Sequence, residues 1–157
     1  MSDTDQVNRT VLDILRREEG TRKSGGRHVV YDDATGNLVV PGYVMKGHPT
    51  VGVGRALDVN GLSDTEADYL LMNDVEGPLR GVPRLVSNWS ALSVNRKAVL
   101  ICMAFQMGLD GLAGFKNTLA DISRSNFTNA AARMLQSLWA KQTPERAKRM
   151  AELMRKG

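Results

Sequence analysis

Cysteine and histidine are scarce in this chain of 157 residues. Cys102 is the only cysteine, so no disulfide can form within the chain, which can therefore fold in a reducing compartment. Because Cys102 lies in the apolar run VLICMAF at 99–105, we expect a buried structural thiol rather than a catalytic one. His28 and His48 have no carboxylate or cysteine partners at the spacing of a metal site, so we expect neither a metal nor another cofactor.

Aromatic residues and long apolar runs are also few. Aromatic residues make up 5% of the chain and methionine occurs eight times, which favours an aliphatic core whose gaps are filled by flexible thioethers. No apolar run approaches the ~20 residues that a membrane-spanning helix needs, so we expect no membrane insertion. The polar N-terminal segment MSDTDQVNRT lacks the pattern of a signal peptide. If the target lies outside the cytoplasm, we expect a separate agent to release the protein.

Positive charge is in modest excess. The net charge of +4 favours polyanionic partners, namely nucleic acid, a membrane surface or a bacterial cell wall, and does not choose among them. Part of the excess lies in the last stretch, 141–157, which has six positive and two negative side chains. Such a stretch is either a phosphate-binding face or, more commonly, the solvated face of a helix.

The first part of the chain predicts one helix followed by short strands. Apolar residues at helical spacing predict a helix over 4–19, ended by Gly20: they are Val7, Val11, Ile14 and Leu15. Residues 21–61 are rich in glycine and predict two or three short strands, with a turn at Pro41-Gly42. The β-prone runs are 28–31, 37–40, 43–45 and 50–54.

The rest of the chain predicts helices. Ser63 and Glu66 form a capping box that opens a helix, which we expect to kink or break at Gly77-Pro78. Ser93 can cap a buried helix over 94–107, because that segment is apolar on nearly all sides. Shorter helices are expected around 115–123, 127–140 and 144–155, with Asn126 or Thr128 capping the second. The fold class is therefore α+β. We expect one domain, 1–157, with a sheet-containing lobe at about 13–76 and a larger helical lobe at about 77–157 that includes the first helix.

Two pairs of carboxylates stand where catalytic acids occur. Glu18 and Glu19 end the first predicted helix, where the negative end of the helix dipole disfavours an ionised carboxyl group. Asp32 and Asp33 follow the run HVVY and precede a turn. Glycoside hydrolysis needs one carboxylic acid to protonate the leaving oxygen and a second carboxylate to steer water. Each pair taken alone is more often a solvated helix end or a turn.

Seven motifs occur in an order that is typical of one family. They are ILRREEG at 14–20, YDD at 31–33, TVGVGRAL at 50–57, LSDTEADYLLMNDV at 62–75, RKAVLICMAFQMG at 96–108, GLAGFKNTL at 111–119 and WAKQTPERAKR at 139–149. In this combination the chain resembles the phage-type lysozymes of the T-even type, over about residues 12–150. The resemblance implies a lysozyme-like α+β fold, in which a small lobe with a short antiparallel sheet is joined by a helix to a larger all-α lobe.

The resemblance also implies a set of site residues. Glu19 matches the family's catalytic glutamate and general acid, Asp33 its catalytic aspartate, and Thr50 the threonine that begins the T-x-G-x-G strand. Asp32 remains a rival of Asp33. Residues that fall where the family lines its glycan cleft, together with one arginine of the basic stretch, are candidates for substrate binding: Phe105, Gln106, Asn117, Thr118 and Arg146.

The implied function is an endo-acting N-acetylmuramidase that cuts peptidoglycan between N-acetylmuramic acid and N-acetylglucosamine during phage lysis of the host. The implied protein is a monomer that binds no nucleic acid and stays in the host cytoplasm until a holin gives it access to the wall. Two rivals stay open. One is a lytic transglycosylase on the same substrate, and the other is a non-catalytic basic helical protein that binds nucleic acid or serves in a virion.

Four departures from the family pattern lead to further expectations. The glutamate–aspartate spacing is longer than usual, and an apparent insertion at 37–49 precedes Thr50. We expect the insertion to form a hairpin or flap beside the cleft. Arg55 replaces the family's histidine and is expected to pair with Asp74. Arg133 stands where the T-even-type pattern has an asparagine.

Overall fold

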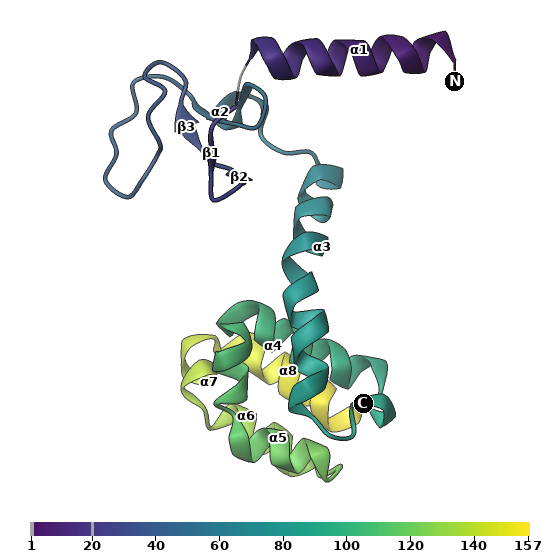
Figure 1. Cartoon of the computed structure of the whole chain (residues 1–157). Coiled ribbons are helices and arrows are strands. Elements are labelled where there is room, and N and C mark those ends of the chain that lie inside the picture. Colours follow the sequence, from purple (N-terminus) through teal and green to yellow (C-terminus); the bar gives the residue numbers. More distant parts are fainter. Residues whose placement is uncertain (1, 20) are drawn as a thin grey trace. The chain divides into compact units, whose positions relative to one another are not determined.

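The computed structural model describes residues 2–19 and 21–157, arranged in two compact units, Met1–Ala67 and Asp68–Gly157. Figure 1 shows the helices and short strands along the chain, coloured from purple to yellow. The α+β class is confirmed. Gly20, the expected terminator of the first helix, lies outside the described residues. The grouping of the first helix with the helical lobe stays a prediction.

The first unit carries all the strands that the structure describes. Helix α1 (Asp3–Glu18) begins at Ser2, whose side chain forms a capping box with Asp5, a signal that the sequence analysis missed. The strands and the short helix that follow are β1 (Lys23–Ser24), β2 (Arg27–His28), β3 (Tyr31–Asp32), β4 (Pro49–Val51), β5 (Arg55–Ala56) and α2 (Leu57–Asn60). The helix expected over 4–19 is confirmed to within a residue at each end.

The strands form a hairpin and a small antiparallel sheet. β1 pairs with β2, and the sheet has the order β3-β4-β5. Thr50, on the central strand β4, lies opposite Tyr31 on one side and Ala56 on the other. The central position explains why Thr50 is almost fully buried, with 2% of its surface exposed.

The 37–49 segment is part of a long loop between β3 and β4 as far as residue 48, and its last residue, Pro49, begins β4. The segment has no hairpin of its own. Leu38 makes a single bridge to Tyr31, and the expected strand at 43–45 does not form. The turn at Pro41-Gly42 is confirmed, since the amide of Tyr43 donates to the carbonyl of Val40 at 2.9 Å. The start of the segment pairs with the β3 side, since the amide of Asp32 donates to the carbonyl of Asn37 and the amide of Val39 to the carbonyl of Val30. Just after 43–45, the amides of Lys46 and Gly47 donate to the side chain of Asp32 and not to a neighbouring strand.

Helix α3 (Asp64–Gly81) runs across the division between the units. The capping box is confirmed: the hydroxyl of Ser63 accepts from the amide of Glu66, and the Glu66 carboxylate accepts from the amide of Ser63. Of the kink or break expected at Gly77-Pro78, the break is wrong, because the helix continues to Gly81, and the kink stays a prediction. Pro78 removes one amide donor three residues before the helix ends, and this local loss does not end the helix.

The second unit consists of helices. After two short 3₁₀ turns, η1 (Val82–Leu85) and η2 (Trp89–Ala91), come α4 (Val94–Ala113), α5 (Lys116–Ser123), α6 (Phe127–Leu135), α7 (Leu138–Gln142) and α8 (Pro144–Lys156). Ser93 caps α4 and Asn126 caps α6, as expected. The single helix expected at 127–140 is wrong, because Ser137 caps a new helix, α7. No single helix in the described part of the chain is long and apolar enough to cross a membrane. Helices α4 and α5 have the required length and apolar composition only when taken together, and they are bent by 101° relative to each other.

The core of the second unit surrounds α4. Its largest fully buried side chains are aliphatic or thioether groups, including Leu100, Met103, Ile122, Met134 and Met154. This confirms the aliphatic, methionine-rich core that the composition predicts. The helix expected to end at 107 meets Gly108, whose backbone is not helical (φ 79°, ψ 164°), and a final turn follows the kink.

Cys102 contradicts the sequence-based expectation, because its side chain is exposed and not buried. Phe105, one turn further along α4, is also 48% exposed. An apolar residue on every side of a helix does not mean that every side is covered, and the helices of this unit leave the Cys102 side of α4 open.

Candidate active site

The three expected catalytic residues come together in the first unit. Glu19, Asp33 and Thr50 line one polar cavity of about 440 Å³. The other lining residues are Thr21, Arg22, Tyr31, Thr35, Gly36 and Gly54. The three come from separate segments: the end of α1, the loop after β3, and the central strand β4. Among the described residues, no group of three or more histidine, cysteine or carboxylate side chains is placed to hold a metal ion.

Glu19 caps the C-terminal end of α1, and its amide donates to the carbonyl of Leu15 at 2.9 Å. Gly54 lies against its carboxyl group. A Cβ placed on Gly54 would be 3.3 Å from Oε2 of Glu19, and Gly54 has a φ of 73°, which disfavours any side chain. The second glycine of the TVGVG motif therefore lets the strand approach the acid closely.

Asp32 and Asp33 have different environments. Asp32 is fully buried and accepts four hydrogen bonds, three from backbone amides and one from the hydroxyl of Tyr43. Burial acts to raise the pKa of Asp32, but the four hydrogen bonds outweigh it and hold the pKa below its ordinary value. Asp33 lines the cavity, and Asp32 is not among the residues that line it. Asp32 therefore closes the base of the 33–48 loop, and Asp33 faces the cavity.

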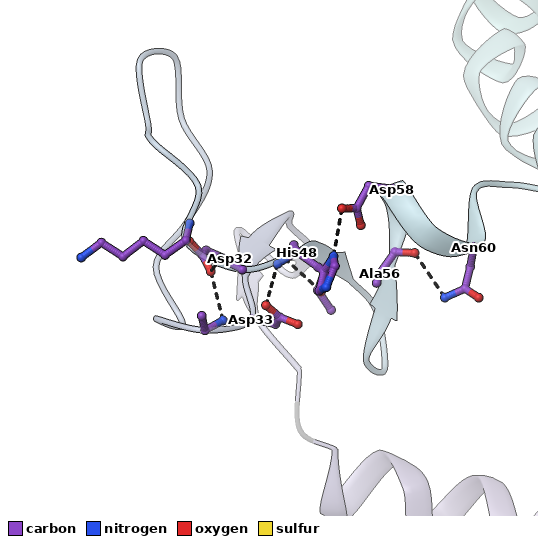
Figure 2. Close-up of polar contacts among 10 residues, drawn as sticks. Asp32, Asp33, His48, Ala56, Asp58 and Asn60 are labelled. Carbon is purple, nitrogen blue, oxygen red and sulfur yellow. Dashed lines mark hydrogen bonds and ion pairs between the residues drawn. The ribbon is translucent and has the colours of Figure 1, made fainter.

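The backbone of His48 connects Asp33 to Thr50, as Figure 2 shows in part. The amide of His48 donates to Oδ1 of Asp33 at 2.7 Å. Its carbonyl accepts from the amide of Asp33 and from the hydroxyl of Thr50, each at 3.2 Å. One peptide segment thus contacts both residues that face the cavity.

The side chain of His48 forms an ion pair. Its Nδ1 lies 2.9 Å from Oδ2 of Asp58 in the short helix α2 (Figure 2). The hydrogen bond and the charge of Asp58 raise the pKa of His48 above its ordinary value, and the same hydrogen bond lowers the pKa of Asp58. The sequence analysis considered His48 only as a metal ligand, because its partner lies ten residues away and on another element.

Arg22 and Tyr31 are further cavity residues that the sequence analysis missed. The guanidinium carbon of Arg22 lies 5.9 Å from the ring centre of Tyr31, and its Nε donates to the carbonyl of Gly36. They place a cation and an aromatic ring in the same cavity as two carboxylates. Arg22 comes three residues after Glu19, and this proximity in sequence was the available signal.

The expected substrate-binding residues lie in the second unit, and only some of them share a cavity. Asn117 and Thr118 line a hollow of about 520 Å³ together with Arg133 and Trp139. Gln106 is not among its lining residues, but accepts a hydrogen bond from the indole of Trp139 at 2.9 Å.

The remaining candidates do not line that hollow. Phe105 is exposed on α4, and Arg146 is an exposed residue of α8. Arg133, which replaces the asparagine of the family pattern, forms an ion pair with Asp121 at 2.6 Å, and Asp121 is nearly buried.

Arg55 was expected to pair with Asp74, but it pairs with Glu66. Both terminal nitrogens of Arg55 donate to the carboxylate of Glu66, and its Nε donates to the carbonyl of Gly61. Each of the three guanidinium nitrogens therefore donates one hydrogen bond. Glu66 is the nearer acid in sequence, two turns before Asp74 on α3.

Comparisons with known proteins show which proteins the chain resembles. The chain is 25% identical to "Probable T4-type lysozyme 2" of Dictyostelium discoideum, over 93% of this chain and 87% of that protein. It is 29% identical over 61% of its length to "Probable T4-type lysozyme 1" of the same organism, of which it spans 58%. The chain is thus similar to proteins that are named as T4-type lysozymes. No family model matches this lysozyme-like chain.

A third relative has a different setting. The lysozyme-like chain is 28% identical to the pre-baseplate central spike protein Gp5 of Enterobacteria phage T4. The match covers 98% of this chain but only 29% of the spike protein. The whole chain therefore corresponds to one part of that larger protein.

Proposed function

We propose that the chain is an endo-acting N-acetylmuramidase that hydrolyses the β-1,4 bond between N-acetylmuramic acid and N-acetylglucosamine in peptidoglycan. The observation that carries the proposal is the meeting of Glu19, Asp33 and Thr50 around one polar cavity. The relatives named as T4-type lysozymes support the same substrate class. Two carboxyl groups in one polar cavity are what glycoside hydrolysis requires.

In the proposed reaction Glu19 donates its proton to the glycosidic oxygen as the bond to the anomeric carbon breaks. Water attacks that carbon from the opposite face, and Asp33 accepts the proton that the water loses. The hydroxyl of Thr50 donates to the carbonyl of His48, so its oxygen is left to accept a hydrogen bond. A water that donates to both Asp33 and Thr50 keeps a lone pair free for the attack.

Clearing of outer-membrane-stripped bacterial cells, followed as loss of turbidity, tests the proposal. We expect the wild type to clear the cells and Glu19→Gln to be slower by a factor of about 10² to 10⁴, because the amide cannot donate the proton. Glu18→Gln is the matched control, since Glu18 pairs with Arg17 and does not line the cavity. Near-normal clearing by Glu19→Gln would show that Glu19 is not the general acid, and the proposed muramidase function would then fail.

A lytic transglycosylase is the principal alternative, and its products differ. Hydrolysis leaves reducing ends, whereas transglycosylation leaves 1,6-anhydro ends, which mass spectrometry of the digest distinguishes. The presence of Asp33 and Thr50 beside the acid favours hydrolysis, because a transglycosylase does not need a positioned water. Water attack from the opposite face inverts the anomeric carbon, so NMR should detect the α-anomer first.

We also propose a role in phage lysis of the host, with a monomeric enzyme held in the host cytoplasm until a holin opens the way to the wall. The match to the spike protein favours one rival setting, in which the enzyme is carried by the virion. Immunodetection separates the two: a free lytic enzyme is found in infected cells and absent from purified particles. Binding to DNA without clearing of cells would instead favour the non-catalytic alternative.

A further inference from the structure

His48 occupies a position between the two residues proposed to hold the water. It belongs to the 37–49 segment, which the sequence analysis interprets as an insertion. Its amide donates to the Asp33 carboxylate, and its carbonyl accepts from the Asp33 amide and the Thr50 hydroxyl. Both hydrogen bonds with Asp33 and the one with Thr50 depend on where this single peptide segment lies.

The ring of His48 fixes that segment to a different element. Asp58, its partner at 2.9 Å, lies in α2, which directly follows β5, the neighbour of β4. The pair therefore links the residue just before β4 to the helix just after β5. The charged groups that act on the ring are Asp58 from α2 and Asp33 from the loop after β3.

We propose that His48 and Asp58 form a positioning pair, in which Asp58 holds the His48 ring so that the His48 peptide orients Asp33 and Thr50. This inference rests on the proposed function for its catalytic consequence. The pair touches no substrate: it acts through the carbonyl that makes Thr50 a hydrogen-bond acceptor and through the amide that fixes one oxygen of Asp33. Loss of the pair should therefore slow turnover and leave substrate binding little changed.

The charge of the pair gives it a defined pH dependence. The pKa of His48 is raised by its hydrogen bond with Asp58 and by the charge of Asp58. The ion pair therefore weakens as pH rises through the raised pKa of His48. Turnover should show a step down on the alkaline side, and removal of the Asp58 charge should move that step to lower pH.

Three variants test the pair: His48→Ala, which removes the ring; Asp58→Asn, which removes the charge; and His48→Asn, whose amide can donate from near the Nδ1 position without titrating. With soluble peptidoglycan fragments, we expect His48→Ala to lower kcat about tenfold with KM within about twofold, as a displaced catalytic group does. His48→Asn should recover most of kcat and lose the alkaline step. Glu145→Gln, which removes another exposed ion pair, that with Lys148, is the control.

NMR separates failure of this inference from failure of the proposed function. Asp58→Asn should shift the ring titration of His48 to lower pH and move the amide signals of Asp33 and His48, while the ring of His28 serves as an internal reference. Unchanged Asp33 and His48 amides would overturn the inference whether or not the chain is active. If the amide signals of Asp33 and His48 move but the chain is inactive on peptidoglycan, only the proposed muramidase function is contradicted. Active variants with wild-type kcat and pH profile would also overturn the inference.

Discussion

Arg55 and Glu66 form a two-point ion pair between strand β5 and the first turn of helix α3, with nitrogen–oxygen distances of 2.8 and 3.1 Å. The same carboxylate also accepts from the amide and hydroxyl of Ser63. The amide of Ser63, its hydroxyl and then the charge of Arg55 hold the pKa of Glu66 below its ordinary value. One side chain therefore caps a helix and ties it to the sheet.

Replacement of Arg55 by methionine should lower the thermal midpoint of unfolding by roughly 2–4 °C at neutral pH. Because the pKa of Glu66 is lowered in the folded state, the stability that its charge provides is present above its unfolded pKa and is lost as pH falls through the lowered value. The difference between Arg55→Met and wild type should vanish in that acidic range. Thermal unfolding measured from pH 7 down to pH 2.5 checks this, and a constant difference would contradict it.

Asp32→Asn and Asp33→Asn should have opposite consequences. Asp32 is buried and accepts four hydrogen bonds, so the loss of its carboxylate should open the 33–48 loop and lower thermal stability. Asp33 lines the cavity, so Asp33→Asn should lower turnover by about 10² or more with little change in stability. Unfolding curves and turbidity assays on both variants show which aspartate stabilises the fold and which one supports activity. The reverse result would make Asp32 the catalytic aspartate.

Acid should act on the loop through Asp32. Its folded-state pKa is lowered, so its contribution to stability is present above the unfolded pKa and is lost as pH falls through the lowered value. Hydrogen exchange of the Lys46 and Gly47 amides should therefore accelerate in strong acid. In Asp32→Asn the same amides should exchange quickly at every pH.

Gly47→Ala should lower activity by disturbing Asp33. A Cβ at Gly47 would overlap the Asp33 carboxylate and lie 2.8 Å from Cβ of Ala34, so the loop must shift. Gly77→Ala is the matched control, because nothing lies within 4 Å of its Cβ and the position is inside a helix. The control should be more stable by about 0.5–1 kcal/mol. Equal activity of the two variants would show that Asp33 tolerates displacement.

Arg133→Met should destabilise the second unit by about 1–3 kcal/mol, since it leaves the nearly buried carboxylate of Asp121 without its charged partner. The double variant with Asp121→Asn should recover part of the loss, because the unpaired charge is then gone. Denaturant unfolding of the three variants measures the coupling. If the two single losses simply add, the pair has no energetic role.

Local signals in the sequence predicted much of the architecture. The capping residues Ser63, Ser93 and Asn126 mark true helix starts, because a cap is a contact between residues three apart. The three residues that the resemblance singled out, Glu19, Asp33 and Thr50, line one cavity, and their catalytic roles stay a prediction.

What the sequence did not predict depends on contacts between distant segments. Asp32 collects donors from residues up to fifteen positions away, and His48 finds Asp58 on another element. The partner of Arg55 was misjudged because several acids on one helix offer the same chemistry, and the structure brings the carboxylate of Glu66 within hydrogen-bond distance. The expected burial of Cys102 was wrong for a related reason, since composition does not say which side of a helix is covered.

The buried carboxylate of Asp32 allows the tip of the 33–48 loop to be replaced without changing the strands on either side. Its two ends are gathered at one point, so the distance between β3 and β4 does not depend on how many residues lie at the tip around Pro41-Gly42. Peptide sequence can therefore be added or replaced at that turn while the strand register, and with it the placement of Thr50, stays the same. The turn is thus a natural position for a reporter tag or for a peptide that binds a chosen surface.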